Sequence, residues 1–393
     1  MDASDLRIAL FSGNYNYVRD GANQALNRLV EYLLRRGAQV RIYSPTVDEP
    51  ALPPMGQVVS VPAVPIPRRT EYRFPVMIPP SVKRDIRAFR PNIFHVASPD
   101  VLGHRAVTLA HKLNQPVVAS VHTRFETYLR YYGLAFVEPL IEAILRRFYR
   151  RCDAIFAPSD SMAQLLREQR MNYNVGIWTR GIDTEIFHPG RRDTEWRRSL
   201  GIEDDVPVIG FVGRLVMEKG LDVFSDAIDC LEQRQVRHKV LVVGEGPARE
   251  WFEARLPNAV FAGFQEGPDL GRAVASMDML FNPSVTETFG NVTLEAMACA
   301  QPVIAAIATG SLSLVTEGVT GRLVRPGAIH AFADALAGYC ADGEGRRRAG
   351  QAGLEVSRRY GWDQVNEALV QAYLRTIRQR SGRGRAPVRS PVP

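Results

Sequence analysis

Residues 208–243 read VIGFVGRLVMEKGLDVFSDAIDCLEQRQVRHKVLVV, and this stretch decides the fold of the second half of the chain. Its first five residues form an apolar run of strand length, residues 221–231 carry apolar side chains at helical spacing, and residues 239–243 form a second apolar run. A strand, a helix and another strand in succession are typical of a parallel α/β sheet. We therefore expect a doubly wound α/β fold here.

The first half of the chain has the same organisation. It opens with an apolar strand at 7–11, continues with a helical pattern that ends at Gly37, and reaches another strand at 39–43. Further apolar runs of strand length lie at 92–96, 116–121 and 154–157 in this half, and at 279–282 and 303–306 in the second half. The sequence predicts a domain boundary within 183–205. We expect an N-terminal domain at 1–185, a C-terminal domain at 186–375 whose last helix can pack back on the first domain, and a basic disordered tail at 376–393.

Size and composition agree with two soluble domains. The chain has 393 residues, of which 46% are hydrophobic and 23% charged, and this exceeds what one core usually fills. The first ten residues lack the features of a secretory signal, and the apolar runs are too short to cross a bilayer. The four cysteines are widely separated and form no CxxC pair. We expect a cytoplasmic protein without a zinc site or a disulfide framework.

Charge is distributed unevenly along the chain. Residues 1–190 hold 24 Lys and Arg against 17 Asp and Glu, whereas residues 191–393 hold 25 of each kind. A basic first half favours a partner or ligand that is anionic. The alternative is a set of solvated charges without a partner.

Two loops follow predicted strands in the second half. In the first, Gly213 allows the backbone to approach a ligand, while Arg214 and Lys219 supply two cations suited to a diphosphate. The alternative is a surface loop with salt bridges. The second loop, GEGP at 244–247, is half of a dinucleotide fingerprint, and a tight structural turn explains it equally well.

A third loop, PSVTETFGNVTLEAM at 283–297, joins a strand to a helix predicted to begin near Asn291. The first turn of that helix would present free backbone N–H groups to an anion, and Gly290 permits close approach. Glu287 and Glu295 flank this turn, and their carboxylates can accept from pairs of sugar or ribose hydroxyls. The residues alone are equally consistent with two acids that bind no ligand, one capping the helix and the other exposed to solvent.

Several motifs together resemble the family 4 retaining glycosyltransferases. They are VGRLVMEKG, VVGEGP, FAGFQEG, NPSVTETFGNVTLEAMACAQPVIA and EGVTGRLV, in that order, with IWTRGIDTEIFHP, VHTRFETYLRYYG and PSDSMAQLLRE upstream. The last three are most similar to the branch of sulfoquinovosyl-diacylglycerol synthases and GDP-mannose-dependent α-mannosyltransferases. The resemblance implies an α/β GT-B fold, in which two doubly wound, Rossmann-like domains face each other across a cleft.

The resemblance also implies roles for residues at matching positions. The catalytic candidates are Arg214 and Lys219 on the donor diphosphate, Glu287 on the donor sugar, and His122 near that sugar. The donor-binding candidates are Asp20 and Gly21 over the phosphates, Gly213, the backbone amides of Phe289, Gly290 and Asn291, and Glu295 on the ribose. Taken alone, a histidine after an apolar strand, as at 122, is more often a structural residue whose hydrogen bonds are made within the protein.

Two departures from the family pattern affect the donor. Residues 308–313 read ATGSLS and keep one glycine where many relatives carry two glycines and an acid. Ala300 and Gln301 also stand where glycine is common before Pro-Val. It is left open how the loop at 308–313 contacts the sugar or the phosphate. These departures favour no single donor.

The resemblance implies a retaining hexosyltransferase that uses GDP-mannose, or secondly a UDP-sugar. No second acid is well placed to act as a nucleophile, so a front-face displacement is expected in which the leaving phosphate takes the acceptor proton. We expect no cofactor and no metal site. The alternatives are a GT-B sugar-nucleotide epimerase and a non-catalytic sugar-nucleotide-binding module.

The acceptor is predicted from the basic first half. Arg68, Arg69 and Arg73 in a proline-rich loop, and four arginines between 146 and 151, favour an anionic membrane surface at which the acceptor is a lipid or a lipid-linked glycan. The apolar side chains of Phe74, Val76 and Met77 would insert into that membrane surface. The alternatives are a soluble acceptor and solvated arginines. Nucleic acid is not expected as a partner, because the Arg-rich tail has no interleaved aromatic residues.

Overall fold

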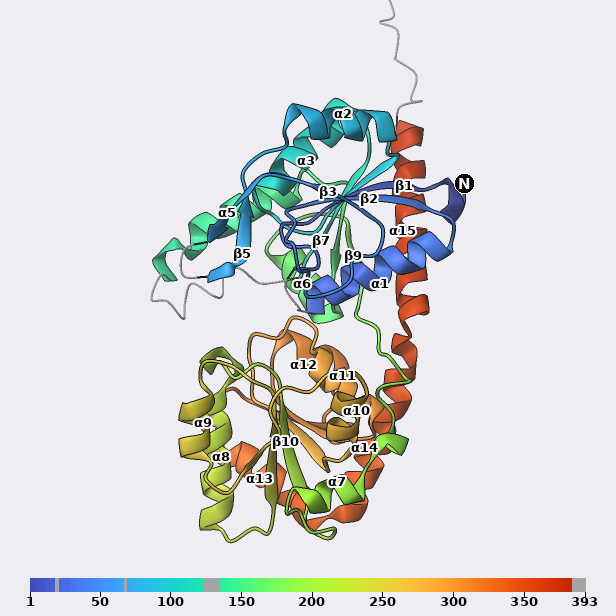
Figure 1. The fold of residues 1–393 in the computed structure, drawn as a ribbon. Helices are drawn as coiled ribbons and strands as arrows, with labels where there is room; N and C mark the ends of the chain where they lie inside the picture. Colours follow the sequence, from blue (N-terminus) through green and yellow to red (C-terminus); the bar gives the residue numbers. More distant parts are fainter. Residues whose placement is uncertain (18–20, 67–68, 123–134, 384–393) are drawn as a thin grey trace, which may run out of the picture. The chain divides into compact units, whose positions relative to one another are not determined.

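The computed structural model describes residues 1–17, 21–66, 69–122 and 135–383, and of residues 66, 69–72, 135 and 382–383 the backbone alone. The chain forms two compact units. Unit 1 contains residues 1–179 and the chain from Asp363 onward, and unit 2 contains Arg180–Trp362. Figure 1 shows each unit as a sheet with helices on both faces.

Unit 1 contains a parallel sheet of seven strands in the order β3-β2-β1-β6-β7-β8-β9. The strands are β1 (Arg7–Phe11), β2 (Gln39–Ser44), β3 (Gln57–Ser60), β6 (Ile93–Val96), β7 (Val117–Ser120), β8 (Ala154–Ala157) and β9 (Val175–Ile177). A separate antiparallel hairpin consists of β4 (Ala63–Ile66) and β5 (Arg69–Pro75). The proline-rich segment thus lies outside the main sheet, because proline cannot donate a ladder hydrogen bond.

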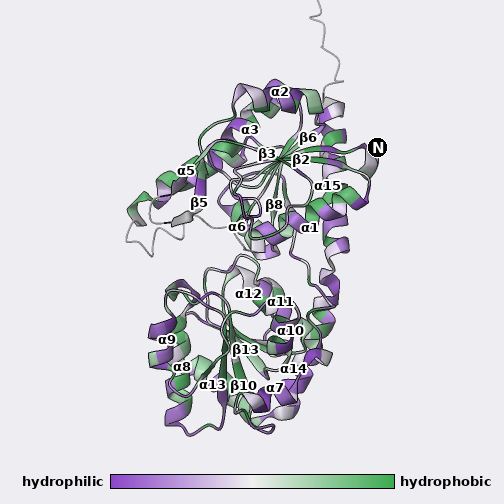
Figure 2. Ribbon diagram, viewed as in Figure 1, coloured by the Kyte–Doolittle hydropathy of each residue, from purple (hydrophilic) through white to green (hydrophobic). Residues whose placement is uncertain are grey.

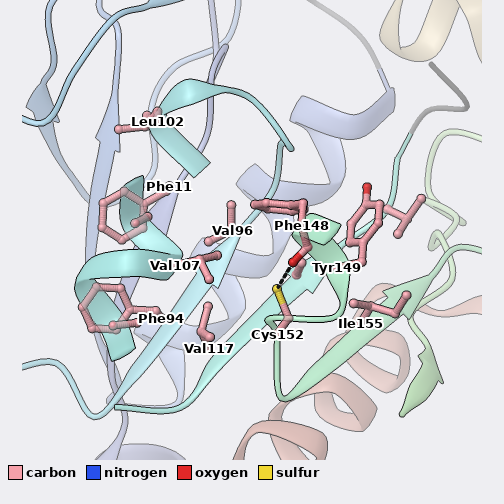
Figure 3. Packing of buried hydrophobic residues seen from close by; sticks show 14 of the residues in the cluster. Phe11, Phe94, Val96, Leu102, Val107, Val117, Phe148, Tyr149, Cys152 and Ile155 are labelled. Atoms are coloured by element: carbon pink, nitrogen blue, oxygen red, sulfur yellow. Dashed lines mark hydrogen bonds between the residues drawn. The ribbon is translucent and has the colours of Figure 1, made fainter. Parts of the chain in front are cut away.

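Helices cover both faces of this sheet. One face carries α2 (Pro80–Phe89), α3 (Val101–Lys112), α5 (Glu138–Tyr149, preceded by η2 at Ala135–Val137) and α6 (Asp160–Glu168). The other face carries α1 (Gly21–Arg35) and α15 (Trp362–Arg383) (Figure 1). Figure 3 shows the first of these interfaces, where Phe11, Phe94 and Phe148 pack among aliphatic side chains.

Unit 2 contains a second parallel sheet, in the order β12-β11-β10-β13-β14-β15. The strands are β10 (Val208–Val212), β11 (Lys239–Val243), β12 (Val260–Phe261), β13 (Met279–Asn282), β14 (Val303–Ala306) and β15 (Gly321–Val324). Figure 1 shows α8 (Leu221–Gln233), α9 (Arg249–Arg255) and α13 (Ile329–Ala341) on one face, and α10 (Gly267–Ala275), α11 (Asn291–Ala298) and α14 (Gly343–Ser357) on the other. Short elements complete the unit, namely η3 (Pro189–Arg191), α7 (Thr194–Ser199), η4 (Met217–Lys219), α12 (Thr309–Leu314) and η5 (Arg358–Tyr360).

Hydropathy follows this arrangement in each unit. The strands are largely apolar, whereas most helices carry both apolar and polar residues (Figure 2). Strands β6, β7, β8 and β14 are buried at every position. Near-continuous apolar runs are expected for parallel strands covered on both faces, so the predicted α/β fold is confirmed.

The C-terminal helix differs from its prediction. Unit 2 ends at Trp362, and α15 continues without a break to Arg383, so a disordered tail from residue 376 is wrong for 376–383. Leu369, Val370 and Leu374 bury an apolar face of this helix, and the side chains of Asn366, Tyr373 and Arg380 bond to residues of unit 1. Residues 384–393 lie outside the described residues.

A buried ion pair fixes the entry into the sheet of unit 2. The Arg197 side chain is fully buried and donates to Asp278 at 2.9 Å, and Asp278 also accepts from the backbone of Val208 at 2.9 Å. A carboxylate that serves a buried cation and the first residue of a strand is costly to leave unpaired.

We predict that Arg197→Met lowers the free energy of unfolding by about 2–4 kcal/mol, because it removes the buried hydrogen bonds of Arg197 to Asp278 and to the Ser276 and Val206 carbonyls, and Asp278 keeps only its partly exposed pair with Arg192. Arg198→Met is the matched control, since Arg198 forms an exposed pair with Asp204 and should change stability by less than about 1 kcal/mol. Urea denaturation of both variants measures the difference. Equal destabilisation by the two substitutions would contradict the assignment.

Candidate active site

Four loops leave the carboxyl edge of the sheet in unit 2. They follow β10 (residues 213–220), β11 (244–248), β13 (283–290) and β14 (307–308). These strands are consecutive neighbours, β11-β10-β13-β14, and all are parallel, so their exits lie at one edge. Ligands of doubly wound sheets bind at that edge.

The first two loops pack against each other through glycine. Gly213 has a φ of 147° and Gly244 a φ of 138°. A Cβ at Gly244 would overlap the carbonyl oxygen of Gly213, and a Cβ at Gly246 would overlap that of Leu215. The Leu215 amide donates to the Glu245 carbonyl at 2.9 Å. Close backbone packing therefore explains the glycines of GEGP, as expected for a structural turn.

Lys219 and Glu287 form the central contact of the site. The Lys219 ammonium donates to the Glu287 carboxylate at 2.5 Å, and the two side chains are 30% and 19% exposed. Lys219 ends η4, and Gly220, with a φ of 75°, packs against Pro283 as the chain enters α8. The structure thus brings together a predicted phosphate cation and a predicted sugar-binding acid that lie 68 residues apart.

Arg214 lies on the same loop as Lys219, but its side chain is exposed and has no ion pair with the described residues. Its guanidinium is therefore not committed to a carboxylate in the described part of unit 2. The two predicted cations differ in this respect, since the Lys219 ammonium is held by a carboxylate.

The third loop ends at a helix start, as the sequence predicted. Gly290 adopts a φ of 95° at the N-cap of α11, and the Leu294 amide donates to its carbonyl. Within the described residues, the backbone N–H groups of Phe289, Gly290 and Asn291 have no acceptor. A helix N-terminus with unused N–H groups favours an anion or a hydroxyl oxygen.

The start of α12, which follows the fourth loop, holds the third loop in place. The Gly310 amide and the Thr309 hydroxyl both donate to the Glu287 carbonyl, at 2.9 and 2.7 Å. A Cβ at Gly310 would lie 2.7 Å from the Phe289 carbonyl carbon. The glycine kept in ATGSLS is therefore required for packing. Thr309 is a positioning residue that the sequence analysis missed, and no motif marked it.

Glu295 lies inside α11, one turn after its start. Burial, and to a smaller extent the negative charge of Glu287, raise the pKa of its carboxyl group from 4.5 to about 7. Its side chain forms no hydrogen bond with the described residues. A poorly solvated carboxylate without donors gains most from a ligand that brings hydroxyl groups.

The remaining candidates lie in unit 1. Gly21 is the first residue of α1, and Asp20 lies outside the described residues. His122 follows β7 and is partly buried, and its Nε2 bonds to the Ser120 hydroxyl at 2.8 Å. No group of three or more His, Cys, Asp or Glu among the described residues is arranged to hold a metal ion. No described helix is long and apolar enough to cross a bilayer.

Solved structures identify the fold. The sucrose-phosphate synthase of Thermosynechococcus elongatus matches with a TM-score of 0.77 and 20% identity, over 95% of this chain and 99% of its own. HepE from Anabaena, solved with UDP and glucose, matches with a TM-score of 0.68 and 17% identity, over 93% and 99%. The fold is that of the GT-B glycosyltransferases.

Sequence comparison identifies the family. The profile of Glycosyltransferase Family 4 matches residues 19–186, and that of Glycosyl transferases group 1 matches residues 206–342. The GDP-mannose-dependent alpha-mannosyltransferase of Mycolicibacterium smegmatis is 32% identical over 96% of this chain and 99% of its own length. The sulfoquinovosyl transferase SQD2 of Arabidopsis thaliana is 30% identical over 91% and 71%. The chain belongs to these group 1 glycosyltransferases, and it is a nucleotide-sugar-dependent hexosyltransferase.

The raised pKa of Glu295 predicts a pH-dependent cost to stability. A carboxyl group whose pKa rises from 4.5 to about 7 on folding costs nothing below pH 4.5, and the cost grows as pH rises toward 7. Glu295→Gln should therefore stabilise unit 2 by up to about 3 kcal/mol at pH 8 and by much less at pH 5. Urea denaturation at both pH values measures this. A stability difference that is the same at pH 5 and pH 8 would contradict it.

Proposed function

We propose that the chain transfers a hexose, with retention, from GDP-mannose to a hydroxyl group of a membrane lipid or lipid-linked glycan, with UDP-sugars as second candidates. The donor follows from relatives that span nearly the whole chain and are GDP-mannose-dependent. The observation that carries the proposal is the Lys219–Glu287 pair beside the start of α11.

The pair can bind both parts of a sugar diphosphate. A lysine ammonium has three donors, so Lys219 can keep one hydrogen bond to Glu287 while it donates to a phosphate oxygen. The Glu287 carboxylate, which accepts from the ammonium with one oxygen, has a second oxygen that can accept from sugar hydroxyls. The N–H groups of Phe289, Gly290 and Asn291 would bind the sugar or the phosphate beside it. Glu295 would accept from the ribose hydroxyls, and Asp20 and Gly21 would close over the phosphates.

Catalysis then depends on the leaving group. Negative charge develops on the nucleotide diphosphate as the glycosidic bond breaks, and Arg214 and Lys219 stabilise it. No second carboxylate is assigned as a nucleophile, so the acceptor oxygen attacks on the face that the phosphate leaves, and the departing phosphate oxygen takes its proton. Because these cations and the α11 N-terminus supply positive charge, we propose that no metal ion is required.

We predict that Lys219→Ala and Glu287→Ala each lower kcat/KM for the donor by about 100-fold or more, because each removes one half of the ion pair and its ligand contacts. Lys239→Ala is the control, since Lys239 begins β11 at the opposite edge of the same sheet. Transfer assays with GDP-mannose and with UDP-glucose measure the effect and the donor preference. Activity of both site variants within about threefold of the parent would reject the assignment.

The acceptor proposal is supported by apolar side chains exposed on unit 1. Phe136, Leu140 and Ile144 recur every four residues along η2 and α5 and are 80%, 62% and 43% exposed. Arg147 and Arg150 are exposed at the end of the same helix. An apolar stripe bordered by arginines fits an anionic lipid surface.

The β4–β5 hairpin carries the residues predicted from the sequence. Phe74 and Met77 are 42% and 47% exposed, Val76 is half-buried, and Arg73 is exposed. The side chains of Arg68 and Arg69 lie outside the described residues.

Leu140→Glu with Ile144→Glu should abolish binding to anionic vesicles, because the two substitutions place charge in the apolar stripe. Phe264→Glu is the matched control, as Phe264 is a 59% exposed aromatic residue of unit 2. Sedimentation with anionic and neutral liposomes measures binding. Equal binding of the parent to both kinds of liposome would argue against an anionic surface.

A further inference from the structure

Four side chains of unit 1 form a hydrogen-bonded chain that ends at His122. The Tyr373 hydroxyl on α15 bonds to His95 Nδ1 at 2.7 Å, and His95 Nε2 bonds to the Ser120 hydroxyl at 2.8 Å. The Ser120 hydroxyl bonds in turn to His122 Nε2 at 2.8 Å. The first three residues are almost completely buried, and His122 is partly exposed. The chain thus joins the C-terminal helix to a candidate active-site residue.

Burial fixes the protonation state of the inner groups. It lowers the pKa of His95 to about 3, and it raises the pKa of Tyr373 well above its ordinary value. His95 is therefore neutral with one ring hydrogen, and Tyr373 keeps its hydroxyl hydrogen. No other hydrogen bond joins the Tyr373 or the Ser120 hydroxyl to the described residues.

Only one direction of the chain uses every buried donor. If Tyr373 donates to His95, His95 donates from Nε2 to Ser120, and Ser120 donates to His122, all three hydrogens are used. The reverse direction leaves the Tyr373 hydrogen without an acceptor. If both histidines donate to Ser120, the hydrogen of the serine hydroxyl has no acceptor. An unsatisfied buried donor disfavours an arrangement by about tenfold or more in population.

Trp178 supports this geometry. Its ring lies edge-on to both His95 and His122, with centroids 6.0 and 5.7 Å apart. The indole Nε1 donates to Asn366 on α15 at 3.3 Å, so the same helix also orients the ring that packs against both histidines.

We propose that Tyr373, His95 and Ser120 are positioning residues that hold His122 in the neutral tautomer with its hydrogen on Nδ1, so that His122 acts as a hydrogen-bond donor to an oxygen of the donor sugar. This inference rests on the proposed function and on the position near the donor sugar that the family resemblance implies for His122. In this tautomer Nε2 accepts from Ser120, and the hydrogen faces away from the buried chain. An imidazole without the chain prefers its hydrogen on Nε2 in water, and it would present a lone pair at Nδ1 instead.

Nitrogen-15 spectra of the full chain labelled at histidine test the tautomer, because protonated and unprotonated ring nitrogens have well-separated shifts. His122→Gln assigns the His122 signals. The parent should show hydrogen on Nδ1. Ser120→Ala should move it to Nε2, and Tyr373→Phe should populate both tautomers, with about a tenfold loss of kcat/KM for the donor. Thr376→Val is the matched control, since it also removes one buried hydroxyl from α15, and it should change neither measurement.

Hydrogen on Nε2 in the parent would overturn the inference. So would unchanged His122 signals in both Tyr373→Phe and Ser120→Ala, provided that each variant melts as a folded protein. If the spectra behave as expected but His122→Gln transfers hexose as fast as the parent, the role of His122 in donor binding is overturned while the tautomer assignment stands. Loss of transfer in Lys219→Ala together with an unaffected His122→Gln would then separate this failure from failure of the proposed function.

Discussion

The contact between Lys219 and Glu287 is the constraint on which the site of unit 2 depends. The two residues come from loops after neighbouring strands, and their charges compensate each other in a setting that is less than one third exposed. Because the Glu287 carbonyl also accepts from Thr309 and Gly310, the loop after β10, the loop after β13 and the start of α12 are all tied to a single residue. A phosphate oxygen that reaches Lys219 meets a cation already positioned, and little conformational entropy remains to be lost on binding.

Glycine makes this convergence sterically feasible. Gly244 and Gly310 each lie where a Cβ would meet the backbone of an adjacent loop, and Gly290 has the left-handed conformation that starts α11. The glycines at these strand exits therefore serve loop packing first, and close approach of a ligand follows from the same compactness. This explains why half of a dinucleotide fingerprint occurs at 244–246 in a chain that has no complete one.

The α/β fold could be predicted from the sequence, because near-continuous apolar strands alternate with amphipathic helices in both halves. The sequence also predicted the neighbourhood of Lys219 and Glu287, because exits of parallel strands share one edge. It could not predict the clamp at Thr309, since a hydroxyl in a short helix has no distinctive spacing. The contact between His95 and Tyr373 was equally hidden, because 278 positions separate the two residues and no local pattern links them.

The course of α15 explains why the tail prediction failed at 376–383 and why the helix matters to His122. Its polar anchors are Asn366, Tyr373 and Arg380, which recur every seven residues and therefore lie on one face of the helix. Each meets a buried or half-buried polar group of unit 1, namely Trp178, His95 and Asp153. Composition suggested disorder because the tail is rich in glycine, proline and arginine, but Arg380 pairs with Asp153, and the register of the buried face decides the structure of 376–383. A helix held at three polar points cannot slide or rotate without breaking all of them, so the Tyr373 hydroxyl is fixed opposite His95 by the packing of the entire helix.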